Sequence, residues 1–327
     1  MPIQEDARYY LKLKALEYYY NKNYTQTEIA KQLNISRVTL AKLLDEAKVE
    51  GMIKIEIVDI RNMKCLLEIE ERLKQRFALR DVLLVDGDKL TEGEVTQRIA
   101  SKGAEYFQLV LRSGMKIGVT WGRTLNAMVN RLEVNRRIRD LAVYTLVGSS
   151  SSNVNFQPNV LAQNLLNKYS GSLHILTAPF ICGSPQLCSD IKAEPQIAKI
   201  LQDSGSADIT VVGLGEAPIE GEWSLGDYPF NRADIEELLA CGAVGDICGN
   251  FFDIHGELCN TSIKPRIVSI DIRTLPQHKL VVGVGGGPKK VKSVFGALNG
   301  GYLDVLITDL QTAMGVLSLK EAELRKC

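Results

Sequence analysis

Three glycine-containing junctions carry residues that could bind a small anion. The first reads Lys116-Ile-Gly-Val-Thr-Trp-Gly-Arg-Thr-Leu, where a strand runs into Gly122 and a helix is expected to begin at Thr124. Backbone N–H groups at a helix start attract anions, and the helix dipole adds to the attraction. Gly122 would let a phosphate approach the backbone, while Arg123 and Thr124 could donate hydrogen bonds to it. On so short a motif, an ordinary strand-to-helix turn is an equally good interpretation.

The second junction reads Gly283-Val-Gly-Gly-Gly-Pro-Lys-Lys-Val-Lys. Its proline suits the first turn of a helix. Backbone amides and one ammonium group would converge on an anion there, and helical spacing lets only one of Lys289, Lys290 and Lys292 point inward. The pattern is neither a P-loop nor a dinucleotide fingerprint, since it lacks the fixed glycine, lysine and Ser/Thr spacing of the former and does not open a domain.

The third junction, Ala243-Val-Gly-Asp-Ile-Cys-Gly-Asn-Phe-Phe-Asp, places Asp246 between small residues in an apolar run. A carboxylate there could accept hydrogen bonds from sugar hydroxyl groups. A structural aspartate that caps a loop is an equally good interpretation. Ser149 and Ser150, at the start of the segment 149–153, offer additional hydroxyl and amide donors.

The segment Gln26 to Leu44 has the pattern of a helix-turn-helix. Thr25 and Ser36 are suitable N-caps for two successive helices, the first beginning at Thr25 or Gln26, and Asn34 tolerates the positive φ expected at the turn between them. The second helix of this motif enters the major groove of DNA, and its first residues meet base edges. The residues expected to contact DNA are Thr25, Gln26, Ser36, Arg37, Thr39 and Lys42.

Arg37 is the first choice for a base contact, because a guanidinium can donate two hydrogen bonds to guanine. A phosphate contact is about equally favoured. Ser36 and Thr39 could reach phosphates or a thymine methyl group. Residues 1–58 hold nine Lys/Arg and eight Asp/Glu, a net charge of about +1, so binding would depend on a focused basic patch and on dimerisation. A small helical bundle with no DNA role is the alternative.

Two flanking segments complete the predicted N-terminal domain. A preceding helix over Asp6–Asn21 is expected to add Tyr10, Leu13, Leu16 and Tyr20 to its core. After Gly51, a natural helix stop, the alternation of Ile53, Ile55 and Ile57 with charged residues suggests a short strand or wing.

The composition of the chain limits which partners and cofactors can be expected. The chain has 327 residues, 39 basic and 39 acidic, so bulk charge alone does not indicate a nucleic-acid binder. No stretch reaches the roughly 18 apolar residues needed to cross a bilayer, and Met1–Leu11 has no apolar signal core, so we expect a cytoplasmic protein without a membrane partner. The seven cysteines and three histidines lack metal-ligand spacing, so neither a metal site nor a cofactor is expected.

The predicted secondary structure that positions these residues differs between the two ends of the chain, helical at the N-terminus and α/β after about residue 78. We assign 1–58 to the helix-turn-helix domain, 59–77 to a hinge and a connecting helix over 65–77, and 78–327 to a Rossmann-like α/β domain. Alternating β-branched and amphipathic stretches favour a mostly parallel sheet. The predicted strands are Val82–Val85, Lys116–Thr120, Ala142–Val147, Leu173–Thr177, Ile209–Gly213, Ile267–Ile270, Lys279–Val284 and Asp304–Thr308, and the helices between them include Gly93–Leu111, Leu125–Leu132, Val160–Tyr169, Pro195–Gln202 and Lys290–Leu298.

These motifs together resemble the SorC/DeoR-type sugar-responsive bacterial regulators over nearly the whole chain. The resemblance rests on four motifs in the right order. They are Tyr24-Thr-Gln-Thr-Glu-Ile-Ala-Lys-Gln-Leu through Ser36-Arg-Val-Thr-Leu, Gly118-Val-Thr-Trp-Gly-Arg-Thr-Leu, Gly245-Asp-Ile-Cys-Gly-Asn-Phe-Phe-Asp-Ile-His-Gly, and Gly286-Gly-Pro-Lys-Lys followed by Gly300-Gly-Tyr-Leu-Asp-Val-Leu-Ile-Thr-Asp.

The resemblance implies a winged-helix-like reader of operator DNA joined to a sensor domain similar to phosphosugar isomerases and glucosamine-6-phosphate deaminases. It also implies a phosphorylated sugar or sugar-like effector and a dimer of dimers on DNA, so we expect a homodimer or homotetramer. By position, the loop Gly122–Thr124 would match the family's phosphate loop, Asp246 its acidic sugar contact, and Lys290 its effector-contacting lysine. Lys289, an extra lysine in this motif, leaves the choice between the two open.

The main rival is an enzyme of the phosphosugar isomerase or deaminase type with an N-terminal extension, since fold does not determine function. Such chemistry needs a positioned acid and base near the sugar carbonyl. Asp246 could be one of them, but no clear second carboxylate accompanies it in the motif segments. We therefore expect a regulator without catalytic residues. A weaker rival, a nicotinamide dehydrogenase, is disfavoured by the position of the glycine motif.

Overall fold

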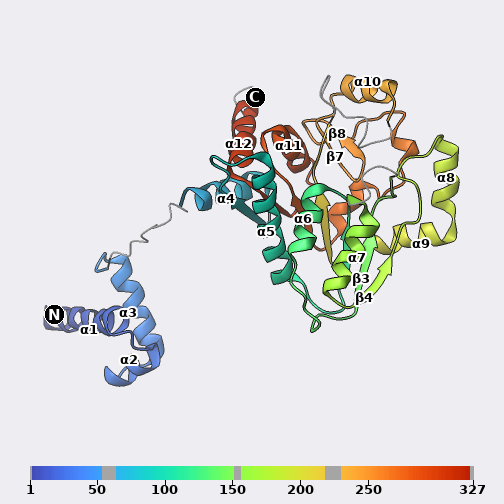
Figure 1. Cartoon of the computed structure of the whole chain (residues 1–327). Coiled ribbons are helices and arrows are strands. Elements are labelled where there is room, and N and C mark those ends of the chain that lie inside the picture. Colours follow the sequence, from blue (N-terminus) through green and yellow to red (C-terminus); the bar gives the residue numbers. More distant parts are fainter. Residues whose placement is uncertain (1, 54–63, 151–155, 218–229, 325–327) are drawn as a thin grey trace. The chain divides into compact units, whose positions relative to one another are not determined.

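A computed structural model describes residues 2–53, 64–150, 156–217 and 230–324 (Figure 1). Its contacts divide the chain into two compact units, Met1–Asn62 and Met63–Cys327. The predicted wing around Ile55 and Ile57, and all of the predicted hinge except its last residue, lie outside the described residues. None of the helices within the described ranges is long and apolar enough to span a bilayer.

The N-terminal unit consists of α1 (Pro2–Leu16), a π-helical turn (Glu17–Asn21), α2 (Gln26–Gln32) and α3 (Arg37–Val49). Local signals set the boundaries of α2 and α3. Thr25 caps α2 in a capping box with Glu28, and the Ser36 hydroxyl caps α3 by accepting from the Thr39 N–H at 3.0 Å. Asn34 has the expected positive φ of 54° between the two helices.

The core contribution expected of the helix predicted over Asp6–Asn21 is correct for Leu16 and wrong for three other residues. Tyr10, Leu13 and Tyr20 are 58%, 43% and 37% exposed. The buried side of α1 instead carries Lys12, Ala15 and Leu16, which share one face at helical spacing. Lys12 pairs there with Glu46 and Glu50 of α3, and Arg8 pairs with Glu46 at 2.6 Å. These ion pairs orient α1 so that its aromatic side faces outward.

The second unit is built on a seven-stranded parallel sheet in the order β1-β10-β9-β5-β2-β3-β4. Most strand residues are buried, as expected for a parallel sheet covered on both faces. The strands are β1 (Asp81–Val85), β2 (Lys116–Val119), β3 (Leu141–Thr145), β4 (Gly171–His174), β5 (Ile209–Gly213), β9 (Val281–Val284) and β10 (Val305–Asp309).

Helices pack on both faces of this sheet, which gives the three layers of a doubly wound fold (Figure 1). One apolar cluster joins the sheet to α5 (Glu92–Val110), α6 (Arg123–Arg131) and α7 (Pro158–Lys168). The other joins it to α4 (Lys64–Phe77), α11 (Val291–Asn299) and α12 (Leu310–Leu324). The remaining helices are α8 (Pro185–Ala193), α9 (Pro195–Ser204) and α10 (Arg232–Ala240).

An excursion between β5 and β9 carries the third predicted junction. It contains a three-stranded antiparallel sheet of β6 (Gly215–Glu216), β7 (Gly245–Ile247) and β8 (Asn250–Phe252), in the order β6-β7-β8. Short 3₁₀ turns follow at η3 (Lys264–Arg266) and η4 (Ile272–Gln277), and another, η5 (Pro288–Lys290), precedes α11.

The predicted α/β class is confirmed, and seven of the eight predicted strands are found in the parallel sheet, with ends shifted by a few residues. The strand predicted over Ile267–Ile270 is wrong. This segment makes only isolated bridges, because its backbone bonds go to two different segments: Val268 donates to Phe180 and Ile270 to Leu146, each at 2.9 Å. The small antiparallel sheet and helices α8, α10 and α12 were not predicted.

Candidate functional site

The carboxyl ends of β2 and β5 meet where the chain changes direction across the sheet. From β2 the chain proceeds through β3 and β4 toward one edge, whereas β5, β9 and β10 lead toward the other. Ligands of open α/β sheets bind outside the carboxyl ends of the strands at such a switch point. The first two predicted junctions follow β2 and β9, and the third lies in the excursion after β5.

At the end of β2, the helix α6 begins without a side-chain cap. Its N-cap residue is Gly122, which has φ 137° and no neighbouring atom within 4 Å of an added Cβ. The helix begins at Arg123, one residue earlier than predicted, and Thr124 occupies its first turn. The first N–H groups of a helix have no partner within it, so this turn presents donors beside open space. Arg123 is exposed and Thr124 is half-buried.

The glycine loop after β9 is held by an aspartate that the motif analysis did not single out. Asp309, buried at the end of β10, accepts a hydrogen bond from the Gly287 N–H at 2.7 Å and from the Thr312 hydroxyl at 2.6 Å. The Gly285 N–H donates to Ile307 O at 3.1 Å. Two of the three glycine amides thus maintain the loop itself, and the expectation that these backbone amides converge on an anion is wrong for Gly285 and Gly287.

Lys290 is the lysine of this loop that points inward. Its ammonium donates to the Leu214 carbonyl and lies 3.7 Å from the Glu216 carboxylate, whereas Lys289 is exposed. Burial lowers the pKa of Lys290; the nearby carboxylates of Glu216 and Asp246 oppose this effect, and the positive charge of Arg123 adds to it. Charges from β6, β7 and the first turn of α6 therefore act on this one ammonium group.

Asp246 has a structural role at the β7–β8 turn. Its carboxylate accepts a hydrogen bond from the Gly249 N–H at 2.8 Å, and the turn has positive φ at both central residues, Cys248 and Gly249. The side chain is 2% exposed. A Cβ on Gly215 would lie 1.8 Å from its other oxygen, so only glycine fits there. The loop-capping interpretation is therefore observed, alongside the electrostatic effect of Asp246 on Lys290.

We call Arg123, Glu216, Asp246 and Lys290 the strand-end cluster. It brings together one predicted residue from each junction and adds Glu216, for which the only sequence signal was its position just after β5. Ser149 and Ser150 lie one strand further along, after β3, where the Ser150 N–H donates to the Gln157 side chain at 2.8 Å. Residues 151–153 of that segment lie outside the described residues.

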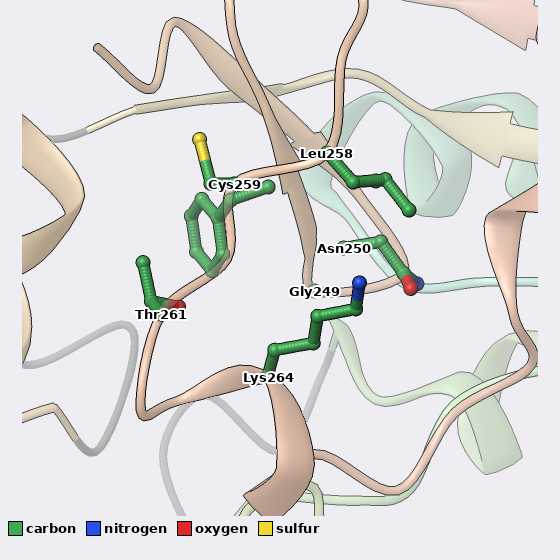
Figure 2. Close-up of a pocket in the computed structure, with 7 residues that line it drawn as sticks. Gly249, Asn250, Leu258, Cys259, Thr261 and Lys264 are labelled. Atoms are coloured by element: carbon green, nitrogen blue, oxygen red, sulfur yellow. The ribbon is translucent and has the colours of Figure 1, made fainter. Parts of the chain in front are cut away.

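A separate small pocket lies at the tip of the β7–β8 hairpin. Figure 2 shows Asn250 and Lys264 on one side of it, with Cys259 and Thr261 nearby. Its free volume of about 10 Å³ holds roughly one water molecule and excludes a sugar. Within the described ranges, no three His, Cys, Asp or Glu side chains gather closely enough to hold a metal ion.

The predicted DNA-contacting residues have three different settings in the N-terminal unit. Arg37 and Lys42 are exposed on α3. The hydroxyl groups of Ser36 and Thr39 lie 2.8 Å apart in the α3 cap, and the Thr25 hydroxyl donates to Glu28 at 2.7 Å in the α2 capping box. These caps hold the first turns of both helices in place. Gln26, the first residue of α2, is half-buried.

The parallel sheet and the strand-end cluster define an α/β unit with a charged group of side chains at its switch point, and comparison with known proteins identifies the kind of domain. A family described as "Putative sugar-binding domain" matches residues 61–318. The chain is 28% identical over 315 residues to the sorbitol operon regulator of Klebsiella pneumoniae, covering 96% of this chain and 98% of that protein. It is 28% identical over 310 residues to the deoxyribonucleoside regulator of Bacillus subtilis (strain 168), covering 94% and 97%.

The crystal structure of full-length SorC from Klebsiella pneumoniae superposes with a TM-score of 0.72 at 27% identity, covering 95% of this chain and 99% of SorC. The chain belongs to the SorC/DeoR-type family of sugar-binding transcriptional regulators. These relatives are named as regulators, so the rival interpretation as an isomerase or deaminase is set aside.

Proposed function

We propose that this regulator reads operator DNA with α3 and is controlled by a phosphorylated sugar bound at the strand-end cluster. The observation that carries the proposal is the Lys290 ammonium, held at Leu214 and Glu216 beside the switch point of the sheet, where α6 begins without a side-chain cap and with Arg123 as its first residue. Two cations and a row of helix N–H donors suit a dianionic phosphoryl group, and the half-buried carboxylate of Glu216 suits a sugar hydroxyl group.

The N-terminal unit supports the DNA part of the proposal. Ser36 and Asn34 build the helix-turn-helix geometry, and Arg37 and Lys42 are exposed on the second helix. One such motif reads only a few base pairs, so we propose a homodimer or homotetramer that reads repeated half-sites about one helical turn apart, or a multiple of it. Such a protein works in the cytoplasm, where its operator lies.

Effector control requires that the sugar bind one quaternary arrangement better than another, because equal affinity for both would change nothing on DNA. Thermodynamic linkage makes the coupling between the two ligands reciprocal. If the sugar changes the affinity for operator DNA, operator DNA changes the affinity for the sugar by the same factor.

A thermal-shift screen tests the effector part directly, since a ligand selective for the folded state raises the melting temperature. The screen compares phosphorylated pentoses, hexoses and polyols with the same sugars lacking phosphate. We expect a shift with one or more phosphorylated members and none with its unphosphorylated partner. Equal shifts for both forms would contradict the phosphoryl assignment, and sustained turnover of any of these compounds would contradict a purely regulatory role.

A further inference from the structure

The first turn of α3, where a recognition helix would meet the bases, carries an exposed apolar residue that neither folding nor the predicted contacts explain. Val38, in the first turn, is 69% exposed. A β-branched residue is a mediocre helix former because its χ1 is restricted, and an exposed valine gains little from burial in return. Its neighbours Arg37 and Thr39 are both polar and exposed. The stability of the helix therefore gives no reason for valine at this position.

The helical period places Val38 at the centre of the outward face. The buried residues of α3 are Leu40, Leu43, Leu44 and Ala47, which pack on the rest of the unit. At about 100° per residue, Val38 lies roughly opposite the middle of that buried face, and Lys42 lies about 40° from Val38. A face that enters the major groove at the start of α3 therefore presents an isopropyl group to the bases, with the Lys42 ammonium one turn further along.

The same geometry changes the role of Thr39. The sequence suggests that Ser36 and Thr39 could reach phosphates or a thymine methyl group, but their hydroxyl groups lie 2.8 Å apart and the Ser36 hydroxyl caps the helix. Arg37 and Thr39 lie on the two flanks of Val38, each about 100° around the helix from it, and of the two only the arginine side chain is long enough to reach forward to a base. This leaves Val38 as the apolar group at the front of α3.

We propose that Val38 reads a thymine through its C5-methyl group, beside the position met by Arg37. This inference rests on the proposed DNA-reading function and specifies its target. Thymine is the one unmodified base that displays a methyl group in the major groove, and apolar side chains recognise it by contact. The operator should then hold at least one T·A pair whose thymine methyl, rather than its hydrogen-bonding edge, sets affinity.

Replacing thymine by deoxyuridine tests the proposed contact of Val38 with the thymine methyl group, because the replacement removes that methyl group and leaves the base pair intact. The full-length chain first selects duplexes from a randomised pool, and each thymine of the selected site is then replaced singly by deoxyuridine. We expect one replacement per half-site to weaken wild-type binding about fourfold, the value of one buried methyl-sized group. The Val38→Ala variant should bind the thymine duplex more weakly and be insensitive to that replacement.

Val49→Ala is the matched control, because Val49 is 88% exposed at the other end of α3. It should keep the wild-type response to every replacement, and unchanged melting temperatures would show that both variants fold. If Val38→Ala kept the wild-type sensitivity at every thymine, the methyl contact would be disproved while DNA binding stood. If the wild-type chain selected no duplex at all, the DNA-reading function itself would fail, and this inference with it.

Discussion

The Lys290 ammonium lies 3.7 Å from the Glu216 carboxylate and donates to the carbonyl of Leu214, so the loop after β9 is tied to the loop after β5. Both loops adjoin the switch point of the sheet, beside the start of α6. An incoming phosphoryl group would offer this half-buried cation a stronger partner than Glu216. A change of partner at Lys290 would then move two loops together, which is the kind of local change that can shift a quaternary equilibrium.

Lys290→Met should weaken binding of the sugar phosphate found in the thermal-shift screen by at least about tenfold. Methionine keeps the length of the side chain and removes a charge-assisted hydrogen bond worth about 1.5–3 kcal/mol. Isothermal titration calorimetry measures the loss. Lys289→Met is the control, since Lys289 is exposed on the same turn, and it should change affinity less than about threefold. Equal losses in both variants would point to general electrostatic attraction instead of a specific contact.

Gly286→Ala should disturb the glycine loop from within. A Cβ at Gly286 would lie 2.3 Å from an Asp309 carboxylate oxygen and 2.7 Å from the Thr308 hydroxyl oxygen. Relieving this overlap should cost about 1–3 kcal/mol of stability and displace the loop that carries Lys290, so sugar-phosphate affinity should fall as well. Urea unfolding and calorimetry measure the two effects. Gly183→Ala, where nothing lies within 4 Å of the added atom, should leave both unchanged.

Arg37→Ala should lower affinity for the selected duplex by about 5- to 150-fold if the guanidinium makes a bidentate contact to guanine, worth about 1–3 kcal/mol. Sugar-phosphate binding should be unchanged, because Arg37 belongs to the other unit. Fluorescence anisotropy gives the DNA affinity. Lys14→Ala removes one exposed positive charge from α1 and should have a much smaller effect. A uniform loss of affinity for all duplexes would assign Arg37 to a phosphate instead.

Stability should fall in acid partly because of His278. This residue is buried, its Nδ1 lies 2.6 Å from the Thr210 hydroxyl, and burial lowers its pKa while the charge of Asp304 opposes the shift. The unfolded chain therefore binds a proton more readily below pH 6.5 than the folded chain does. The contribution of neutral His278 is complete above pH 6.5 and declines as the pH falls toward the lowered folded value.

Urea unfolding at pH 7.5 and pH 5.5 checks this expectation. His278→Gln should lose less stability between the two values than the wild type does, and His255→Gln, at an exposed histidine, should behave like the wild type. A pH dependence unchanged by His278→Gln would show that other groups govern acid stability.

Local signals made helices α2 and α3 and the glycine junctions predictable. Thr25 and Ser36 are caps whose partners lie three residues away, and Asn34 is suited to a single positive φ. Gly122 precedes a helix within the same ten-residue motif. Features that depend on a few neighbouring residues can be inferred from one sequence.

Long-range pairing was beyond such inference. Lys290 and Leu214 are 76 positions apart, and the sequence contained no signal that they meet. The outward aromatic side of α1 depends on Lys12 pairing with Glu50, which is 38 positions away. Ile267–Ile270 has the composition of a strand, but a strand needs a continuous neighbour, and this segment finds only isolated partners. In each case tertiary contacts decided what local preference left open.

The proposed function depends on the coupling of a sugar-phosphate site to DNA reading in one chain. The direct measurement is fluorescence anisotropy of the selected duplex bound to wild-type protein, titrated with the sugar phosphate found by thermal shift. We predict that the sugar phosphate changes duplex affinity severalfold in the wild type, and that Lys290→Met binds the duplex normally but needs at least about tenfold more ligand for the same change. A ligand that binds tightly and leaves duplex affinity unaltered would contradict the account.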